Sequence, residues 1–338
     1  MRVVSVPGDG IGPEVMREAV AALAVVAPDI VVEEHPLGAA AIEQHGDPLP
    51  AVTLDACLGA EAVLMGAVGA NHDWKDRLNP EEGMFRLRRE LDVYANLRPF
   101  EHDGIDLIIV RELVGGLYFG ERGARPDGTV FDTCEYHPDQ VERVLRRAFE
   151  IAGTRRGKLT SVDKANVLAT SRMWRAIAER LAPEYPDVSL EHLLVDTAAL
   201  HLVRDPRRFD VIVTENTFGD ILSDVAAAIG GGLETAASAC IGDGRPGLFE
   251  PVHGTAPDIA GSGRANPAAM LLSTALMLRY GLDRDEEANR LEAAVQHAAD
   301  TRKSNGTTRA FGNAVVNHLR SATNGGVTSG PQEGIVDE

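Results

Sequence analysis

Short apolar runs alternate along the chain with segments in which every third or fourth residue is apolar. The runs predict buried strands, and the second pattern predicts helices that pack one face against them. A chain that alternates in this way is typical of an α/β fold. The predicted strands are Arg2–Val6, Ala62–Gly66, Leu107–Val110, Leu159–Val162, Leu190–Val195 and Val211–Val213.

The same pattern predicts two amphipathic helices and one uniformly apolar segment. Pro13–Ala27 and Pro138–Gly153 each carry a single apolar stripe, which predicts a helix with one face on the core. The segment Ala268–Leu278 is apolar throughout, yet it is too short to cross a bilayer. It predicts a helix buried in the core or at a subunit contact, and we expect no membrane partner.

Composition narrows the possible functions. At 338 residues and 44% hydrophobic, the chain can bury a sizeable core and has the length of about two domains. Its net charge of −18 argues against a nucleic-acid partner, because the sequence carries no basic stripe to neutralise phosphates. An anionic substrate would therefore need a local cluster of cations that works against the overall field.

The cysteines and the chain ends favour a cytoplasmic protein. Cys57, Cys134 and Cys240 are odd in number and far apart, so they fit neither a metal site nor a disulfide framework. The N-terminus enters a strand at once, with no signal peptide before it. Residues 321–338 are rich in Gly, Ser and Thr, which predicts a disordered tail.

The stretch PGDGIGPEV (7–15) follows the first predicted strand. Gly8, Gly10 and Gly12 are spaced G-x-G-x-G, one residue short of the dinucleotide-binding fingerprint. No acidic residue ends a second strand about 20 residues later, as that fingerprint requires. The stretch predicts a tight turn from strand to helix rather than a phosphate loop. It therefore argues against a 2-hydroxyacid dehydrogenase on a Rossmann fold.

Two carboxylates in FGDILSD (218–224) are candidate metal ligands. Asp220 and Asp224 are four residues apart, which places both on one face of a helix. This helix follows the apolar strand DVIVT (210–214), so it begins at the carboxyl edge of a sheet, where ligands gather. Paired carboxylates suit Mg²⁺ or Mn²⁺, although two acids on a helix can also be a solvated surface.

Three arginines are candidate anion ligands. Arg111 ends an apolar strand, where its guanidinium must find an anion or a carbonyl. Arg88 lies in MFRLRREL (84–91) and Arg98 in NLRP (96–99). Together the three would suit a dicarboxylate, whereas each alone could be an ordinary surface charge.

Two further clusters have a functional and a plain interpretation. Lys164 ends a strand beside Asn166, and it is a base only if desolvation or nearby charge lowers its pKa. Asp196, at the end of LEHLLVD (190–196), is a possible partner or a helix cap. Residues 250–267 form a long loop without an apolar period, which is either a ligand-binding loop or a structural excursion.

Five motifs follow one another along the chain: ANLRP (95–99), VRELVGGLYFGE (110–121), SVDKANVL (161–168), FDVIVTENTFGDILSD (209–224) and EPVHGTAPDIAG (250–261). In this order they resemble the β-decarboxylating dehydrogenases, the family that acts on isocitrate, homoisocitrate, tartrate and 3-isopropylmalate. The resemblance extends from residue 7 to about 311. It is strongest to the members that convert 3-isopropylmalate to 4-methyl-2-oxopentanoate in leucine biosynthesis.

The resemblance implies an open, two-domain α/β fold unlike the Rossmann fold. Residues 1–94 and 231–320 would form the first domain, on the cofactor side. Residues 95–230 would form the second, with the substrate, metal and dimer contacts. The chain would be a homodimer whose two active sites are shared.

The resemblance also implies a role for each candidate. Three would bind the malate carboxylates: Arg88, Arg98 and Arg111. Three would hold Mg²⁺ or Mn²⁺ against the substrate: Asp220, Asp224 and Asp196 of the partner subunit. Lys164 of the partner subunit would help to remove the C2 hydroxyl proton, and Tyr118 would protonate C3 after CO₂ is lost.

The cofactor would be NAD, with its adenosine half on the 250–267 loop. The matching residues are His253, Gly254, Thr255, Ala256, Asp258, Ile259 and Asn266, with Ile11 and Asn166 from elsewhere in the chain. An acid at Asp258 would accept hydrogen bonds from the ribose hydroxyls and repel a 2′-phosphate. We therefore expect NAD rather than NADP.

The sequence departs from the family pattern in the helix that sets substrate choice. Members that oxidise 3-isopropylmalate show an acid and then a Leu-Leu pair against the isopropyl group. Here the acid is Glu81 and the pair is Met84-Phe85, so an apolar 3-substituent is still expected in a differently shaped pocket. The link FEHDGID (100–106) is also short. These changes leave room for a relative that acts on another 3-substituted malate, or for a non-catalytic regulatory relative.

Overall fold

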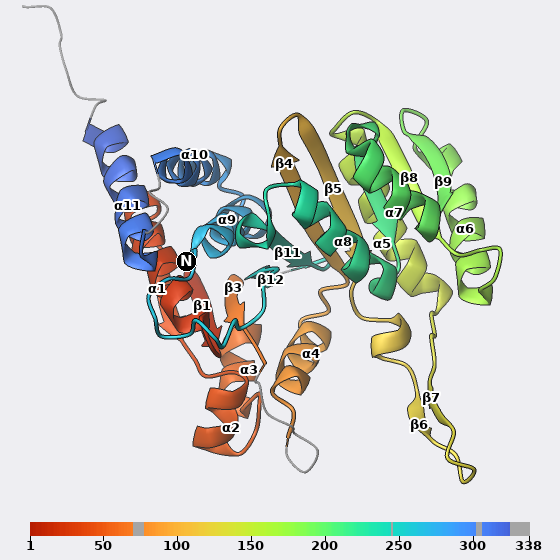
Figure 1. Cartoon of the computed structure of the whole chain (residues 1–338), viewed down its shortest axis with the longest axis horizontal. Coiled ribbons are helices and arrows are strands. Elements are labelled where there is room, and N and C mark those ends of the chain that lie inside the picture. Colours follow the sequence, from red (N-terminus) through yellow and green to blue (C-terminus); the bar gives the residue numbers. More distant parts are fainter. Residues whose placement is uncertain (70–77, 245, 302–305, 325–338) are drawn as a thin grey trace, which may run out of the picture.

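The computed structural model describes residues 1–69, 78–244, 246–301 and 306–324 (Figure 1). Its described strands form one large sheet of ten strands and a separate hairpin. In spatial order the sheet contains β2 (Val31–Glu34), β1 (Arg2–Gly8), β3 (Ala62–Ala67), β12 (Gly247–Pro251), β11 (Ala237–Ile241), β4 (Ala95–His102), β5 (Ile105–Glu112), β10 (Val211–Thr214), β8 (Lys158–Asp163) and β9 (Ser189–Leu194). The α/β fold and all six predicted strands are confirmed.

The centre of the sheet is antiparallel and both of its flanks are parallel. The pairs β12–β11, β11–β4 and β4–β5 are antiparallel, and the other pairs are parallel. The short link predicted at residues 100–106 is a tight hairpin, in which most of these residues belong to β4 and β5. Asp103 and Gly104 turn the chain with φ of 49° and 78°, a pair of positive values that suits a two-residue hairpin.

Six helices cover one face of the sheet along its whole width. Their apolar side chains share one core with the alternate residues of β1, β3, β4, β5, β10, β11 and β12. Both predicted amphipathic helices lie here, and the segment at 268–278 is buried in this core as expected. The six are α1 (Gly12–Val26), α5 (Pro138–Gly153), α6 (Ala169–Leu181), α9 (Ala268–Leu276), α10 (Asp285–Thr301) and α11 (Thr308–Asn324).

The last described helix extends beyond residue 321, where the sequence predicted that a disordered tail begins. Helix α11 continues to Asn324, so residues 321–324 of the expected tail are helical. Residues 325–338 lie outside the described residues. In the part of the chain that the structure describes, no helix has the length and apolar character needed to span a membrane.

The opposite face of the sheet has two separate cores. One lies under α3 (Ala51–Leu58) and α4 (Pro80–Glu90), with α2 (Ala39–His45) next to α3 in Figure 1. The other lies under α7 (Val195–Arg204) and α8 (Asn216–Ile229). The hairpin of β6 (Arg122–Ala124) and β7 (Val130–Asp132) projects away from this half (Figure 1).

A buried polar region separates these two cores. Side chains alternate between the faces of a strand, so the neighbours of apolar core residues on the central strands point to the second face. Those neighbours are polar and buried: Asn96 and Arg98 on β4, Arg111 on β5 and Glu250 on β12. Because buried polar groups are stable only when paired, this region must form a connected network.

Candidate active site

The three candidate arginines converge on the polar region, each with its own partner. Arg88, on α4, forms an ion pair with Glu250, with 2.6 Å between Nη2 and Oε1. Arg98 donates from Nε to Asn96 Oδ1 over 2.7 Å and also contacts the Ser223 hydroxyl. All five of these side chains are buried, so the arginines are fixed before any ligand arrives.

Asp220 is the carboxylate at which this cluster meets. It forms an ion pair with Arg111 and lies 3.7 Å from Arg98 Nη2. Burial would raise its pKa, but attraction to Arg111 and then Arg98 outweighs burial and lowers it. Asp224 lies one turn further along α8, 4.0 Å from Arg98, and burial raises its pKa. The shared helix face predicted from their spacing is confirmed.

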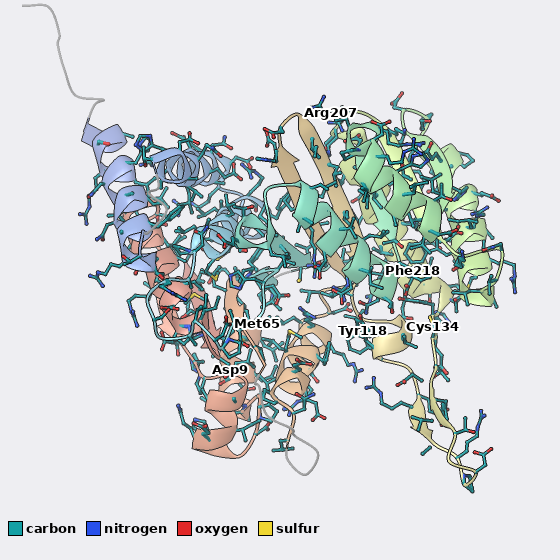
Figure 2. The ribbon with its side chains drawn as sticks, viewed as in Figure 1. Asp9, Met65, Tyr118, Cys134, Arg207 and Phe218 are labelled. Atoms are coloured by element: carbon teal, nitrogen blue, oxygen red, sulfur yellow. The ribbon has the colours of Figure 1, made fainter. Side chains whose placement is uncertain are left out.

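Tyr118 completes the cluster from the short 3₁₀ helix Gly116–Tyr118. Its hydroxyl donates to Asp220 Oδ2 over 2.9 Å. Figure 2 shows Tyr118 below Phe218, which lies in the first turn of α8. Burial and the negative charge of Asp220 raise the pKa of Tyr118 to about 12, so the phenol keeps its proton at neutral pH.

Lys164 and Asp196 form a separate pair. Lys164 Nζ lies 2.7 Å from Asp196 Oδ1, and this hydrogen bond lowers the pKa of Asp196. Among the described residues, no three His, Cys, Asp or Glu side chains lie close enough together to hold a metal. Asp196 therefore does not join Asp220 and Asp224 within one chain, and a three-carboxylate site requires a second copy.

The 250–267 stretch begins as the end of β12 and then forms a loop anchored on the first glycine turn. Ile11 N donates to Thr255 O over 2.9 Å. Gly10 has φ of 58°, and a Cβ there would lie 2.2 Å from the same carbonyl oxygen, so only glycine fits this close approach. The glycine stretch is thus a turn that supports the loop. The Ile11 side chain itself is buried in the core, with 4% exposure.

The loop shows two features of a ligand-binding surface. Ala256 has φ of 38°, a strained conformation for a residue with a Cβ. His253 Nε2 is buried without a hydrogen-bond partner in the described structure, and burial lowers the pKa of this histidine. Among the other candidates, Gly254, Asp258 and Asn166 are exposed, whereas Thr255, Ile259 and Asn266 are half-buried. Asn266 Nδ2 already donates to Glu234.

Comparisons with known proteins identify the family of the chain. Residues 2–317 match the family described as isocitrate/isopropylmalate dehydrogenase. The chain belongs to this family. The 3-isopropylmalate dehydrogenase of Deinococcus radiodurans is 47% identical to it, over 95% of this chain and 98% of the relative. The enzyme of the same name from Heyndrickxia coagulans is 48% identical over 87% of each chain.

Solved structures of family members share the fold. The isocitrate dehydrogenase of Methylococcus capsulatus superposes with a TM-score of 0.87 at 35% identity, over 94% of this chain and 99% of its own. A β-decarboxylating dehydrogenase of Thermococcus kodakarensis gives a TM-score of 0.83 at 35% identity, over 96% and 97%. The expected fold type is therefore confirmed.

In this member of the isocitrate/isopropylmalate dehydrogenase family, helix α4 contacts the Tyr118 segment. The Phe85 ring meets the Phe119 ring edge to face, with 5.7 Å between centroids. Met84 is half-buried against the core under α3 and α4, and Glu81 is exposed. The departure from the family pattern thus places an aromatic contact where α4 approaches residues 116–119.

Sequence reasoning missed the residues that hold the family's arginines in this chain. They are Asn96, Asn216 and Glu250, all buried polar side chains. Asn96 and Glu250 could have been found from the sequence, because each lies on a strand at a position where the period-two alternation places a side chain in the interior. Asn216 follows a strand in a segment without such a period, and its partner cannot be read from spacing.

Proposed function

We propose that this chain catalyses the NAD-dependent oxidative decarboxylation of 3-isopropylmalate to 4-methyl-2-oxopentanoate, a step of leucine biosynthesis, in the cytoplasm. Relatives named for this activity share 47–48% of its residues over most of its length. The observation that carries the proposal is the cluster of buried arginines that meets Asp220 beside a protonated Tyr118.

The arginine cluster supports binding of a malate. Arg98 and Arg111 are buried and share Asp220, whereas Asp224, 4.0 Å from Arg98, is 62% exposed, so positive charge prevails in the buried part of the cluster. A dicarboxylate can supply the missing charge through paired hydrogen bonds to the guanidinium groups. Because the chain carries a net charge of −18, this local excess is what would attract an anion.

Asp220 and Asp224, with Asp196 of the partner subunit, fit Mg²⁺ or Mn²⁺. Their side chains are 39% and 62% exposed, so an ion can reach both, and carboxylate oxygens are the donors that these hard cations prefer. Arg111 and Arg98 keep the pKa of Asp220 low, against the effect of burial, and so favour its ionised form. When bound, the ion would stabilise the negative charge that develops on the C2 oxygen.

The strained loop at 253–266 supports NAD as the cofactor. The unpaired His253 Nε2 and the positive φ of Ala256 mark a surface prepared for a ligand. When bound, NAD would accept the hydride from C2. The exposed Asp258 would accept hydrogen bonds from the ribose hydroxyls and repel a 2′-phosphate.

Replacing Asp258 by Lys tests this cofactor choice. The variant should lose roughly 100-fold in kcat/KM with NAD and gain with NADP, because an attraction to the 2′-phosphate replaces a repulsion. The control is Asp55→Lys, an exposed acid on α3, which should leave the cofactor ratio unchanged. Equal efficiency of the unaltered protein with both cofactors would contradict the role of Asp258.

A homodimer with shared sites is part of the proposal. The Lys164–Asp196 pair stands apart from Asp220, and a second copy can bring the two together. Large apolar side chains on α7 and α8 remain exposed: Leu200, Val203 and Ile221. Such a face is suited to burial between subunits. Light scattering at micromolar concentration should give the mass of a dimer, and a monomer mass would contradict this.

We also propose that residues 1–94 with 231–320, and residues 95–230, move as two domains about the central strands. The separate cores under α3–α4 and under α7–α8 fit such a division on this face of the sheet, because buried polar side chains lie between them. Scattering profiles recorded with and without substrate would differ if the two halves close, and identical profiles would argue against the division.

Within this proposal two side chains move protons. Lys164 of the partner subunit takes the C2 hydroxyl proton. Tyr118 then protonates C3 after CO₂ leaves, since burial and Asp220 raise its pKa to about 12 and keep the phenol protonated until then.

Turnover with a panel of malates tests the proposal. NADH formation is expected to be fastest with 3-isopropylmalate, slower with other 3-alkyl malates, and very slow with isocitrate, homoisocitrate and tartrate. Chelation of divalent ions should abolish it, and added Mg²⁺ or Mn²⁺ should restore it. No turnover on any member of the panel would contradict the activity, and turnover that survives chelation would contradict the metal.

A further inference from the structure

Asn216 is the first residue of α8, and all of its polar groups are bonded. Its side chain is 1% exposed. Its Oδ1 accepts from Arg111 Nε over 2.9 Å and from Arg111 Nη2 over 2.7 Å. Its Nδ2 donates to Gly115 O over 2.9 Å, and its backbone N donates to Tyr136 OH over 2.9 Å. One amide therefore joins β5, α8 and the segment that leads to Tyr118.

The bonds to Oδ1 fix the Arg111 guanidinium without neutralising it. Two of its nitrogens are held by a neutral acceptor, which leaves Nη1 directed at Asp220. A carboxylate at this position would hold the fork equally well but would cancel its charge. The amide thus orients a binding group and keeps its attraction for an anion.

The bond from Nδ2 fixes the segment that carries Tyr118. Gly115 O is held by Asn216, and Gly115 N donates to Glu112 Oε2 over 2.9 Å. A Cβ at Gly115 would lie 2.6 Å from the Tyr136 ring, so this backbone lies directly against the ring. The 3₁₀ helix that ends at Tyr118 begins at the next residue. A shift at Gly115 would therefore move the phenol relative to Asp220.

We propose that Asn216 is a positioning residue that fixes the substrate-binding Arg111 and the proton-donating Tyr118 at the correct positions relative to each other. The inference rests on the proposed function, which gives those two side chains their roles. An amide suits both bonds, since its oxygen accepts from the guanidinium while its nitrogen donates to the carbonyl.

The step that depends on this relative position of Arg111 and Tyr118 is protonation at C3. When CO₂ leaves the oxidised substrate, the electron pair of the broken C3–C bond forms a C2–C3 double bond, and the π pair of the C2 carbonyl moves onto its oxygen to give an enolate. The C2–C3 pair then takes the phenol proton of Tyr118 to form the new C3–H bond, the C2 carbonyl re-forms, and the Tyr118 phenolate regains a proton from solvent. If Tyr118 is displaced, solvent competes for this step from both faces of the enolate.

Two variants test the proposal. Asn216→Asp keeps Arg111 in place but cancels its charge, and it loses the donor to Gly115 O, so KM for the malate should rise roughly tenfold and kcat should fall roughly tenfold. In D₂O, the product trapped at once as leucine by leucine dehydrogenase should carry deuterium on both faces of the old C3. Asn216→Leu loses both functions, so its KM should also rise by roughly tenfold.

Asn96→Asp is the matched control, because it alters the amide that holds Arg98 and makes no bond to the Tyr118 segment. It should keep deuterium on a single face of C3. An Asn216→Asp variant with unchanged kcat and a single labelled face would overturn the proposal, as would an Asn216→Leu variant with unchanged KM.

The wild-type panel separates this inference from the proposed function. If the wild-type chain turns over none of the malates, the function is wrong. The positioning claim is then decided by crystal structures of both Asn216 variants, in which Gly115 should shift in both and Arg111 only in Asn216→Leu. Unshifted groups would overturn it.

Discussion

Arg88 and Arg111 reach the same polar region, but a carboxylate holds the first and a neutral amide holds the second. Arg88 is paired with the carboxylate of Glu250, and both side chains are 8% exposed. Arg111 is held by the neutral amide of Asn216 and, within the described chain, pairs with one carboxylate, Asp220, which also lies near Arg98. Arg88 therefore has a carboxylate to itself, whereas Arg111 shares its carboxylate and keeps more charge to offer to a ligand.

The pKa shifts show the same asymmetry. Burial would lower the pKa of Arg88, but its attraction to Glu250 outweighs burial and raises it. Burial, followed by repulsion from Arg111, lowers the pKa of Arg98 to about 10, and attraction to Asp220 only partly offsets this. Positive charge is therefore concentrated on β4 and β5. The difference teaches that Arg88 has a buried counter-charge of its own, whereas Arg98 and Arg111 share Asp220.

Removing Arg111 should have the largest effect on activity. Arg111→Ala should reduce kcat/KM for the malate by roughly 1,000-fold, because it loses a bidentate charged partner at the reacting carboxylates. The free energy of unfolding should change by less than about 2 kcal/mol, since water can reach the remaining Asp220. Steady-state kinetics and urea unfolding measure both. Arg146→Ala, which removes an arginine on α5 that pairs with Glu142 and Glu184, is the control and should leave kcat/KM near that of the wild type.

Breaking the Arg88 pair should act mainly on stability. Glu250→Gln leaves a buried guanidinium without a counter-charge and should lower the free energy of unfolding by about 3 kcal/mol. Urea denaturation at neutral pH measures this loss. Glu82→Gln, an exposed acid on the same α4, is the matched control and should change stability by less than about 0.5 kcal/mol. If Glu250→Gln were as stable as the control, Arg88 would not depend on its carboxylate, and the contrast with Arg111 would fail.

The sequence predicted the parallel flanks of the sheet better than its antiparallel centre. Continuous apolar runs such as Leu107–Val110 identified the parallel strands, because strands buried on both faces leave such runs. Strand β4 was missed, since Asn96, Arg98 and Pro99 interrupt its apolar positions. Asn96 and Arg98 belong to the candidate site. The polar residues that obscured the apolar pattern of β4 are therefore the same ones that give the region its charge and hydrogen-bonding groups.

The sequence pointed to residues of the candidate site but not to the partners with which they pair. Arg111 at a strand end and Asp220 on a helix start are visible in the sequence, and the family resemblance added Arg88, Arg98 and Tyr118. Arg88 and Glu250 are 162 residues apart, and Arg111 and Asn216 are 105 apart. No local period links such pairs, because the packing of the whole sheet brings them together.

The smallest expected effect concerns Glu112, which supports the Arg111 side of the comparison. Burial raises the pKa of Glu112 to about 7, partly opposed by the N–H groups of Val114 and Gly115. Between its unfolded pKa, about 4.5, and about 7, the native protein holds a proton that the unfolded chain has released. Stability contributed by this group is therefore lost as pH rises, by about 2 kcal/mol from about pH 5.5 to about pH 8.

Glu112→Gln removes this titration and should flatten the corresponding part of the pH dependence. The free energy of unfolding, measured by urea at both pH values, should fall less on going to the higher pH in the variant than in the wild type. Glu121→Gln, an exposed acid for which no such burial exists, is the control and should follow the wild-type curve. Parallel curves for wild type and Glu112→Gln would mean that Glu112 is ionised in the fold throughout. Negative charge would then extend to the segment behind Arg111, and the two arginines would differ less than their direct partners suggest.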